Sequence, residues 1–424
     1  MITSTTPIKR VPSAVANPHS RPRPVDSRPD PRPPAERLLA YCRTEGWAGY
    51  DPYDALNSRL LNAMPMLDFR IARIGLTQIL KRSPFNIRAL LAIPKTQNPK
   101  GLALFLKASL KLSRHGLVAD DELIAGFVDR LIALRAPNTR HWAWGYSFPW
   151  QTRTIVVPTG TPNLVCTTFV SDALLDMYEQ RGDPRCLEMA RSAAAYIADE
   201  LYWNDEDGVA SFDYPLPGLG SRIHNANFLA AAFLSRVWTH TRESRLLDRA
   251  MSVARYSAGR QRSDGSWVYG EAPTQQWVDN FHTGYNLGGL RAFASYARTD
   301  EFDESIQRGF DFYLAHFIRA DGAPAYFHNQ LYPIDVHCVA QSLITLTQFQ
   351  DLDSRSLTMA YSVFEWAMKH MWDERGYFYY RVLRFGTIRT SYMRWSQAWM
   401  LLAIATLLDG ADARRTEPAL QASL

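Results

Sequence analysis

Ten residues near the middle of the sequence concentrate side chains that can move protons. Residues 277–286 read Trp-Val-Asp-Asn-Phe-His-Thr-Gly-Tyr-Asn, so a carboxylate, an imidazole and a phenol stand just before an apolar segment. Glu271 lies a few residues upstream, at the end of a short aromatic segment. A pair of carboxylates can cleave a glycosidic bond, one as proton donor and the other as base or nucleophile. Asp279 and Glu271 are therefore candidate catalytic carboxylates, with His282 and Tyr285 placed to orient them or the substrate.

Comparable residues stand at other predicted helix starts. Cys166, His224, His282, His337 and Arg394 are separated by 58, 58, 55 and 57 residues, each at the entrance of an apolar segment. Helix N-termini present free N–H groups and partial positive charge, which suit sugar hydroxyls, carboxylates or phosphates. If these entrances converge, they form one binding mouth. We expect the following substrate-binding residues there: Trp150, Asn163, His224, Asn225, Trp277, Asn280, Asp335, His337, Tyr392 and Arg394.

Each of these groups also has an ordinary structural explanation. A buried histidine near a helix start commonly satisfies a hydrogen bond, and Asp279 and Asp335 are suited to cap the helices that follow them. A structural ion pair is the commoner use of a single arginine, although Arg394 could also pair with an acidic sugar. In a chain that is 12% aromatic, most rings fill space between helices, while those near the mouth can stack on sugar rings. Both explanations stay open at the level of sequence.

A repeating unit positions these residues. Its turns contain Gly208, Gly265, Gly322 and Gly376, which are separated by 57, 57 and 54 residues. Aromatic residues at near-alternate positions follow each turn and predict short strands at 209–214, 266–269, 323–328 and 377–382. A fixed period of this length indicates stacked copies of one supersecondary unit.

Two kinds of helix alternate within the repeat. The first kind is apolar or small nearly all round and should be buried on every side, with members predicted at 101–112, 164–180, 225–237, 283–296, 334–349 and 392–408. The second kind carries charges at helical spacing and should face solvent, with members at 120–134, 183–202, 244–259, 301–318 and 354–371. Residues 53–81 are left to close the ring against the last inner helix. The predicted fold is an all-α (α/α)6 toroid of helical hairpins with short aromatic β-strands in its loops.

This arrangement resembles the six-hairpin glycosidase superfamily over roughly residues 95–410. Segments 147–152, 161–166, 279–286, 332–337 and 391–395 are similar to a bacterial subfamily associated with polysaccharide production, for which we know of no established reaction. The resemblance implies a toroid and a carbohydrate substrate, and it leaves the reaction open.

Composition divides the chain into four parts. Residues 1–34 contain nine of the 25 prolines and four of the five net positive charges, and we expect this tail to be disordered. The other parts are a helical segment that closes the ring, the toroid domain and a flexible C-terminus, at 35–95, 96–410 and 411–424. The nearly neutral body indicates no nucleic-acid-binding face.

Several site and partner classes are not indicated by the sequence. It contains no secretory signal and no apolar stretch long enough to span a bilayer, so we expect a cytoplasmic protein without membrane insertion. The four cysteines are scattered and predict neither a disulfide nor a zinc site. Phosphate-binding glycine loops and a His-Glu-x-x-His motif are missing too. A metal set of Asp335, His337 and a second histidine has unspecific spacing, so we assign no metal and no cofactor. No oligomeric state is indicated.

The leading functional hypothesis is a carbohydrate-active enzyme that acts by acid–base chemistry on an oligosaccharide or exopolysaccharide. Glycoside hydrolysis is narrowly preferred. The first alternative is a sugar epimerase or a polysaccharide lyase, because histidine and tyrosine can remove a proton from carbon without paired carboxylates. The second alternative is a non-catalytic glycan-binding or polysaccharide-assembly protein. Neither the sugar nor its linkage can be named from the sequence.

Overall fold

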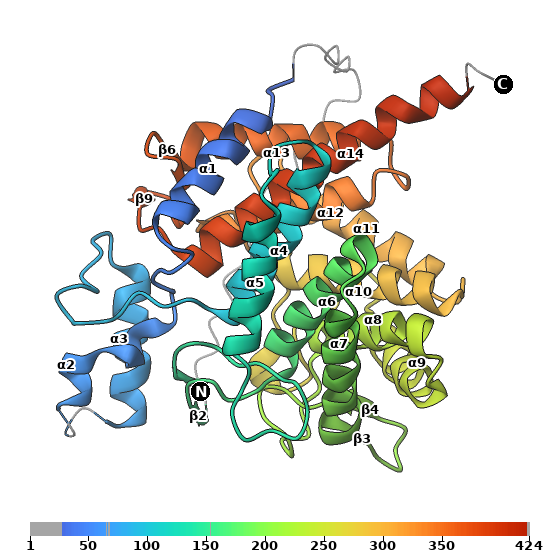
Figure 1. Ribbon diagram of the computed structural model, residues 1–424, viewed down its shortest axis with the longest axis horizontal. Helices are drawn as coiled ribbons and strands as arrows, with labels where there is room; N and C mark the ends of the chain where they lie inside the picture. Colours follow the sequence, from blue (N-terminus) through green and yellow to red (C-terminus); the bar gives the residue numbers. More distant parts are fainter. Residues whose placement is uncertain (1–27, 65, 67, 153, 422–424) are drawn as a thin grey trace, which may run out of the picture.

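The computed structural model describes residues 28–64, 66, 68–152 and 154–421 of the 424-residue chain. Within them, six inner helices form a ring in which each contacts the next, and the last contacts the first (Figure 1). The inner helices are α4 (Pro99–Arg114), α6 (Leu164–Arg181), α8 (His224–Thr241), α10 (Asn280–Ala297), α12 (Val336–Gln348) and α14 (Trp399–Gln421). The expected (α/α)6 toroid is confirmed. A π-helical segment, Met393–Ala398, leads into α14 and occupies the start of the helix predicted at 392–408.

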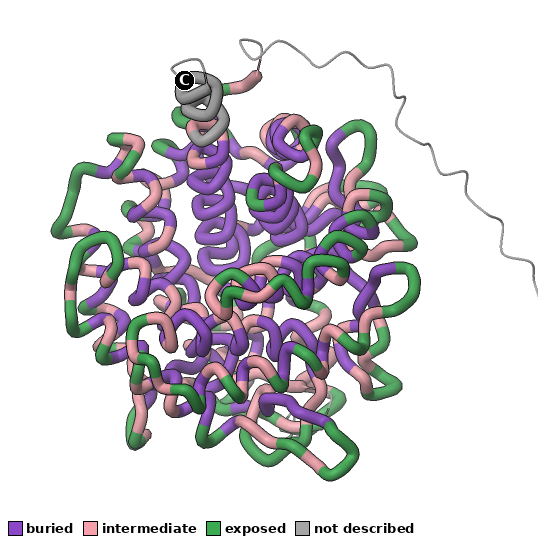
Figure 2. The backbone as a smooth tube through the Cα atoms, turned by 90° about the vertical axis from the view of Figure 1, so that its right-hand side faces the viewer, coloured by how far each residue is buried: buried purple, intermediate pink, exposed green. Residues whose placement is uncertain are grey.

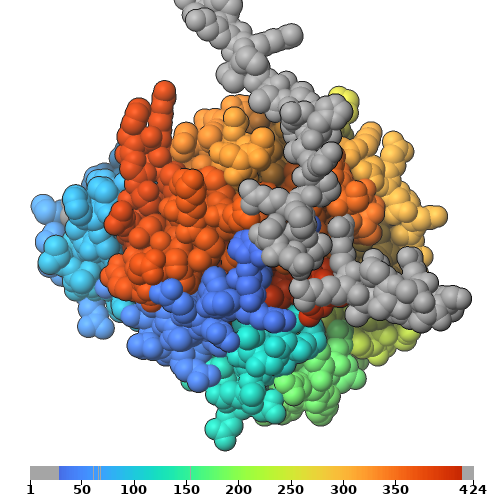
Figure 3. All heavy atoms as spheres, turned by 90° about the horizontal axis from the view of Figure 1, so that it is seen from above, coloured from blue at the N-terminus to red at the C-terminus, as the bar shows by residue number. Residues whose placement is uncertain are grey.

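A second helix packs on the outside of each inner helix. In ring order from the partner of α4, the outer helices are α5 (Asp121–Ala133), α7 (Pro184–Tyr196), α9 (Ser244–Ala258), α11 (Asp303–Phe317), α13 (Ser356–Met371) and α1 (Arg32–Thr44). We expected residues 53–81 to close the ring, but α1 packs against α14. It does so because Ala35, Leu38 and Cys42 form a buried stripe at helical spacing. Figure 3 shows this blue helix lying against the orange and red C-terminal part of the chain.

Burial distinguishes the two helical layers. Twelve of the thirteen residues of α12 are buried, as expected for a helix enclosed on every side. Helix α9 buries one stripe, at Leu246, Ala250, Val253, Ala254 and Ser257. The purple turns in Figure 2 therefore gather in the inner helices, and the green segments lie in outer turns and loops. The alternation of apolar and amphipathic helices in the sequence follows from this difference in environment.

The repeated glycines are required by the turns that join the repeats. Gly208, Gly265, Gly322 and Gly376 have positive φ values of 79°, 90°, 85° and 92°, a conformation that side chains with a Cβ rarely adopt. At Gly265 a Cβ would also lie 2.4 Å from the carbonyl oxygen of Arg308. The sequence period therefore records a conformational requirement of each turn.

Nine short strands occur in the described loops and pair only antiparallel. They are β1 (Trp150–Gln151), β2 (Val156–Val157), β3 (Tyr202–Asn204), β4 (Ala210–Phe212), β5 (Ile334–Asp335), β6 (Trp372–Asp373), β7 (Tyr377–Phe378), β8 (Arg381–Leu383) and β9 (Gly386–Ile388). The pairs are β1 with β2, β3 with β4 and β6 with β7, while β8 lies between β5 and β9. Strands predicted at 266–269 and 323–328 are instead loops with isolated bridges, such as Asp279 with Phe327.

Residues 54–93 form a projection beside the ring, visible at the left of Figure 1. Its described residues include a 3-10 turn, Asp54–Asn57, and two helices, α2 (Arg59–Asn62) and α3 (Arg70–Arg82). It has its own small core of Ala55, Leu80 and Ile93. A buried ion pair, with Arg88 Nε 2.8 Å from Asp54 Oδ1, ties the loop after α3 to its base. The segment expected at 35–95 thus holds two parts, an outer helix and a projection.

The chain ends differ from the expected boundaries. Helix α14 continues to Gln421, so most of the segment expected to be a flexible C-terminus is helical. Of the tail expected at 1–34, residues 1–27 lie outside the described residues, and α1 already begins at Arg32. Arg28 donates to Thr358 Oγ1 at 3.1 Å on α13. None of the described helices has the length and apolar character needed to cross a bilayer.

Candidate functional site

The entrance of α10 holds a carboxylate and an imidazole in direct contact. Asp279 caps the helix, its Oδ1 accepting the backbone N–H of His282 at 2.9 Å. Its Oδ2 accepts from His282 Nδ1 at 2.7 Å and from Trp277 Nε1 at 2.9 Å. Three donors therefore fix the carboxylate, and the carboxylate fixes the imidazole with its proton on Nδ1. Asp279 is both the helix cap and the orienting partner of His282.

The other nitrogen of His282 is open. The side chain is 20% exposed, and among the described residues no hydrogen bond engages Nε2. The rings of Tyr269 and Phe281 lie 4.5 Å and 4.2 Å from the imidazole, centre to centre, and hold it from two sides. An oriented imidazole with a free Nε2 lone pair is suited to act as a general base.

A second pair links α10 to α12. The hydroxyl of Tyr285 lies 2.6 Å from Nε2 of His337. Burial, together with the positive charges of Lys100 and Arg394, lowers the pKa of His337 well below its usual range, and burial raises that of Tyr285. Both groups are therefore neutral near pH 7 and share a hydrogen bond that holds the Tyr285 hydroxyl in place.

Phe281 joins the two pairs into one cluster. Its ring centre lies 4.2 Å from that of His282 and 4.8 Å from that of His337. The rings of His282 and Tyr285 are 6.1 Å apart. Four groups that can hold or pass protons, Asp279, His282, Tyr285 and His337, are thereby gathered at the entrances of two neighbouring inner helices.

Helix α4 adds a buried amine that our reading of the sequence missed. Lys100 is 4% exposed, and its Nζ lies 3.9 Å from the ring centre of Phe169, 5.6 Å from that of Tyr285 and 5.3 Å from that of Trp399. In the described part of the chain no carboxylate forms an ion pair with this amine, and no hydrogen bond from it is found; Asp51 attracts it from farther away. Burial, and next the charge of Arg394, lowers the pKa of Lys100 well below its usual range. One signal was available, because Lys100 stands at a helix entrance beside the cap Asn98.

Asp335 has a positioning role. It is fully buried, and its Oδ2 accepts from Arg381 Nε at 2.6 Å. Its Oδ1 accepts from Trp395 Nε1 at 2.8 Å and from the backbone N–H of His337 at 2.9 Å. The carboxylate therefore caps α12 and holds His337 and Trp395 in fixed positions.

Arg394 is held in a buried ion pair. Its Nε and Nη2 donate to Asp51 Oδ2 and Oδ1 at 2.7 Å and 2.9 Å. Its guanidinium lies 5.1 Å from the ring centre of Tyr146. Tyr392 is buried under the guanidinium of Arg88, 4.8 Å from the ring centre. Arg394 and Tyr392 are therefore engaged in contacts inside the protein, as expected for residues that stabilise the fold.

His224 and Glu271 belong to a second cluster on the side of α9. His224 is fully buried, with Nδ1 3.3 Å from Ser257 Oγ and Nε2 4.0 Å from Glu271 Oε1. Burial lowers the pKa of His224 to about 4. Glu271 accepts from the hydroxyl of Tyr256 at 2.6 Å and lies 3.4 Å from Arg222 Nη1. Within the described residues no contact joins Glu271 to Asp279, so these carboxylates do not form a contacting pair.

Three predicted asparagines have interior surroundings. Asn163 caps α6 by accepting the backbone N–H of Cys166 at 2.9 Å. Asn280 donates to Ser342 at 3.1 Å and accepts from Tyr313 at 2.9 Å, which joins α10 to α12 and α11. Asn225 is buried near the start of α8. These contacts match the structural explanation for Asn163 and Asn280.

Aromatic side chains surround the cluster. Trp277 stacks on Tyr269, with ring centres 4.5 Å apart and planes 10° from parallel. Trp150, on β1, lies 6.2 Å from Tyr146 and 6.3 Å from Tyr214. All five side chains are partly exposed, and such rings are suited to stack on sugar rings.

No protein-family model matches the sequence, and no curated protein is similar to it. Solved structures share its fold at low identity. Cellobiose 2-epimerase from Spirochaeta thermophila DSM 6192 is 15% identical, with a TM-score of 0.57 over 75% of this chain and 86% of that chain. A GH76 alpha-mannanase from Bacteroides thetaiotaomicron is 11% identical, with a TM-score of 0.56 over 77% and 90%. An unsaturated glucuronyl hydrolase specific for heparin is 12% identical, with a TM-score of 0.59 over 89% and 96%.

These likenesses confirm the expected resemblance in fold to the six-hairpin glycosidases. The similar proteins include an epimerase and two kinds of hydrolase, so one fold carries several reactions. The reaction of this chain must therefore be argued from its own side chains.

Proposed function

We propose that the protein is a carbohydrate-active enzyme that moves a proton at a sugar carbon, as an epimerase does. The observation that carries the proposal is the pairing of Asp279 with His282, in which no hydrogen bond from the described residues engages Nε2, so that it can act as an oriented base. Three proteins of similar fold are named for reactions on carbohydrates, which supports a carbohydrate as the substrate.

In the proposed reaction His282 Nε2 takes the proton from a carbon next to the carbonyl of an open-chain sugar. The C–H electrons move toward the carbonyl oxygen and form an enolate. Lys100 donates a hydrogen bond to that oxygen as negative charge develops on it. Tyr285 then returns a proton to the opposite face of the carbon, with its hydroxyl held by His337. The two sites exchange protons with solvent before the next turnover.

Hydrolysis by Asp279 and Glu271 receives less support from the contacts. Asp279 already accepts three hydrogen bonds, and Glu271 is engaged by Tyr256 and lies near Arg222. A glycosidase requires one carboxyl to protonate the leaving oxygen and a second to act on the opposite side of the sugar. Neither engaged carboxylate is free for such a role without losing its present partners.

The test is incubation with neutral, acidic and amino oligosaccharides in deuterium oxide, followed by NMR and mass spectrometry. We expect deuterium at one carbon of both the recovered and the isomerised sugar, and its loss in His282→Gln. His240→Gln is the matched control, because His240 bonds to Glu179 at the far end of α8. New reducing ends without deuterium would instead identify a hydrolase, and an unsaturated product would identify a lyase. Binding without any exchange would identify a glycan-binding protein.

A further inference from the structure

Exposed apolar side chains are concentrated on the projection, residues 54–93. Of the thirteen large apolar side chains that are exposed in the described chain, eight lie between residues 60 and 90. They are Leu60, Met64, Met66, Phe69, Ile71, Ile79, Phe85 and Leu90. Ile71, Phe85 and Leu90 are 76%, 75% and 80% exposed. Exposed apolar side chains gathered on one small segment mark an interaction site more often than a free surface.

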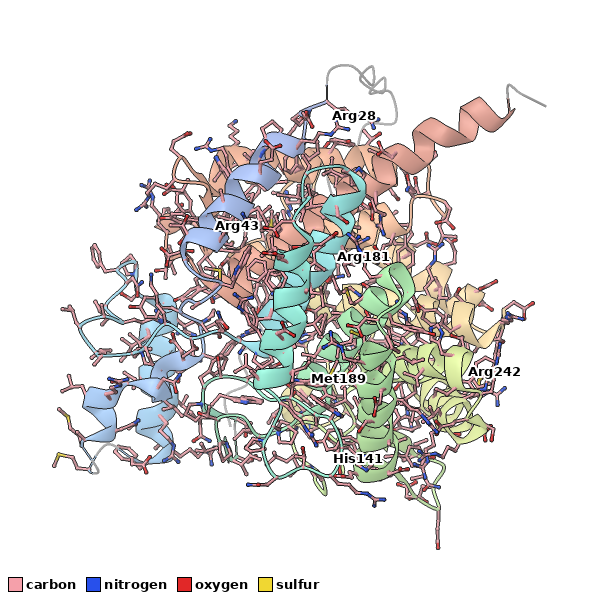
Figure 4. The ribbon with its side chains drawn as sticks, viewed as in Figure 1. Arg28, Arg43, His141, Arg181, Met189 and Arg242 are labelled. Carbon is pink, nitrogen blue, oxygen red and sulfur yellow. The ribbon has the colours of Figure 1, made fainter. Side chains whose placement is uncertain are left out.

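Helix α3 leaves one face exposed. Of its thirteen residues only Leu80 is buried; Leu76 is partly buried against the same small core, while Ile71 and Ile79 are exposed. A soluble helix normally turns such residues toward a core. Figure 4 shows the side chains of the projection standing away from the body, and Figures 1 and 3 both place the projection at the margin of the molecule.

The same surface is positively charged. Arg59, Arg70 and Arg82 are exposed, and within the described residues none of them pairs with a carboxylate. Asp68 is the only acidic residue between 55 and 95, and it is taken by Arg73, Nη1 to Oδ1 at 2.6 Å. Apolar side chains interleaved with arginine are the composition of helices that lie in the headgroup region of a bilayer.

We propose that the projection docks on an anionic lipid bilayer, with α3 lying on the surface and its apolar side chains entering the headgroup region. Charge complementarity favours this occupant over a second copy of the chain. A two-fold contact would place the arginines of one patch against those of the other, and the like charges would repel. With thirteen residues α3 is too short to span a bilayer, so the contact is peripheral.

The projection is fixed to the rim of the candidate site. Lys81 Nζ donates to the hydroxyl of Tyr53 at 2.7 Å, and the Tyr53 ring lies 5.5 Å from that of Trp395. Arg73 Nε donates to Gln151 Oε1 at 2.8 Å on β1. A docked projection would therefore bring the entrance loops of the toroid to the membrane surface. This inference rests on the projection alone and does not depend on which reaction the site performs.

The test is co-sedimentation of the full chain with phosphatidylcholine vesicles, with and without phosphatidylglycerol. We expect binding to the anionic vesicles that falls as salt is raised. Ile71→Ser/Ile79→Ser and Arg70→Ser/Arg82→Ser should each weaken it about tenfold or more, because each removes two groups that contact the bilayer. Phe385→Ser is the matched control, since Phe385 is 87% exposed in the β8–β9 hairpin, and its binding should equal wild type.

Three outcomes overturn the proposal. Wild-type protein that stays in the supernatant with anionic vesicles has no such surface. Binding that survives both double substitutions belongs elsewhere, for example to the basic residues of the 1–34 tail. Light scattering that shows a dimer dissociated by Ile71→Ser/Ile79→Ser, without vesicle binding, assigns the patch to self-association. Circular dichroism of each variant checks that these exposed substitutions leave the fold intact.

Discussion

The amine of Lys100 lies 3.9 Å from the centre of the Phe169 ring, and no carboxylate of the described residues forms an ion pair with it. Lys107, farther along the same helix α4, is paired with Asp172 and, at 3.1 Å, with Asp176. The pKa of Lys100 is therefore lowered by burial, whereas the ion pairs of Lys107 raise its pKa. A buried amine without an ion partner lowers the stability of the fold, and such groups are typical of functional sites.

Lys100→Met should abolish turnover while leaving the fold equally or more stable. The folded-state pKa of Lys100 is lowered, so below the unfolded pKa of about 10.4 the unfolded chain binds the proton more tightly and the residue destabilises the fold. Removing it should raise the free energy of unfolding by about 1 to 3 kcal/mol at pH 7. Urea denaturation and the deuterium-exchange assay measure both effects.

Lys107→Met is the control for this substitution. It leaves Asp172 and Asp176 without one of their cationic partners and should lower the free energy of unfolding by about 1 to 3 kcal/mol. If Lys100→Met destabilised the protein as much as Lys107→Met, the amine of Lys100 would have a structural partner, and its proposed role would be wrong.

Tyr285→Phe should reduce turnover by about 10² to 10⁴, because it removes the hydroxyl that carries the second proton. Tyr313→Phe is the matched control, since the Tyr313 hydroxyl is also buried and bonds to Asn280 and Ser342 away from the cluster. Both variants should lose about 1 kcal/mol of stability through the missing hydrogen bond. Equal turnover in the two variants would remove Tyr285 from the mechanism.

His224 should make the fold less stable in mild acid. Its pKa is about 4 in the folded protein because of burial, and about 6.5 in the unfolded chain. Between those values the unfolded state binds the extra proton, so stability rises with pH and is lost as pH falls from 6.5 to 4, by about 3 kcal/mol for this group. Urea midpoints at pH 7 and pH 4 should therefore differ less in His224→Asn than in wild type. If the midpoint difference were the same in both proteins, the pKa of His224 would be the same in the folded and unfolded states.

Arg394→Met should destabilise the fold by about 3 to 5 kcal/mol, because it strands the buried carboxylate of Asp51. The double variant Asp51→Leu/Arg394→Met should recover much of that loss. We further expect its preference between acidic and neutral saccharides to match wild type, measured by calorimetric titration. If this variant lost affinity for acidic saccharides alone, Arg394 would be a substrate-binding residue.

The fold could be predicted from the sequence because its period has a physical origin. Four of the six repeats have a turn glycine with positive φ, the inner helices are apolar nearly all round, and both signals are local. The position of α1 could not be found in this way. Its first residues, Arg32 to Pro34, belong to a Pro/Arg-rich stretch that reads as a disordered tail, and only the contact with α14 shows where the helix packs.

The side-chain directions at the site could not be predicted because the repeats enter their helices in different registers. His224 is the first residue of α8, His337 the second of α12 and His282 the third of α10. Each step turns a side chain by about 100° around the helix axis. Although the three histidines are almost equally spaced in the sequence, their side chains therefore point in different directions. His282 and His337 lie beside Tyr285, whereas His224 lies near Glu271. The surroundings of Lys100 could not be predicted either, because the rings around it come from three helices that are far apart in the sequence, α6, α10 and α14.

Closure of the ring by α1 against α14 has a consequence for how the protein is made. These are the first and last helices of the described chain, and Asp51 and Arg394 are joined across nearly its whole length. On the ribosome the ring must stay open until α14 has emerged. Until then the apolar sides of α4 and α12 that pack against α14 are exposed. A stalled or truncated chain would keep them exposed and would be prone to aggregate or to be bound by chaperones.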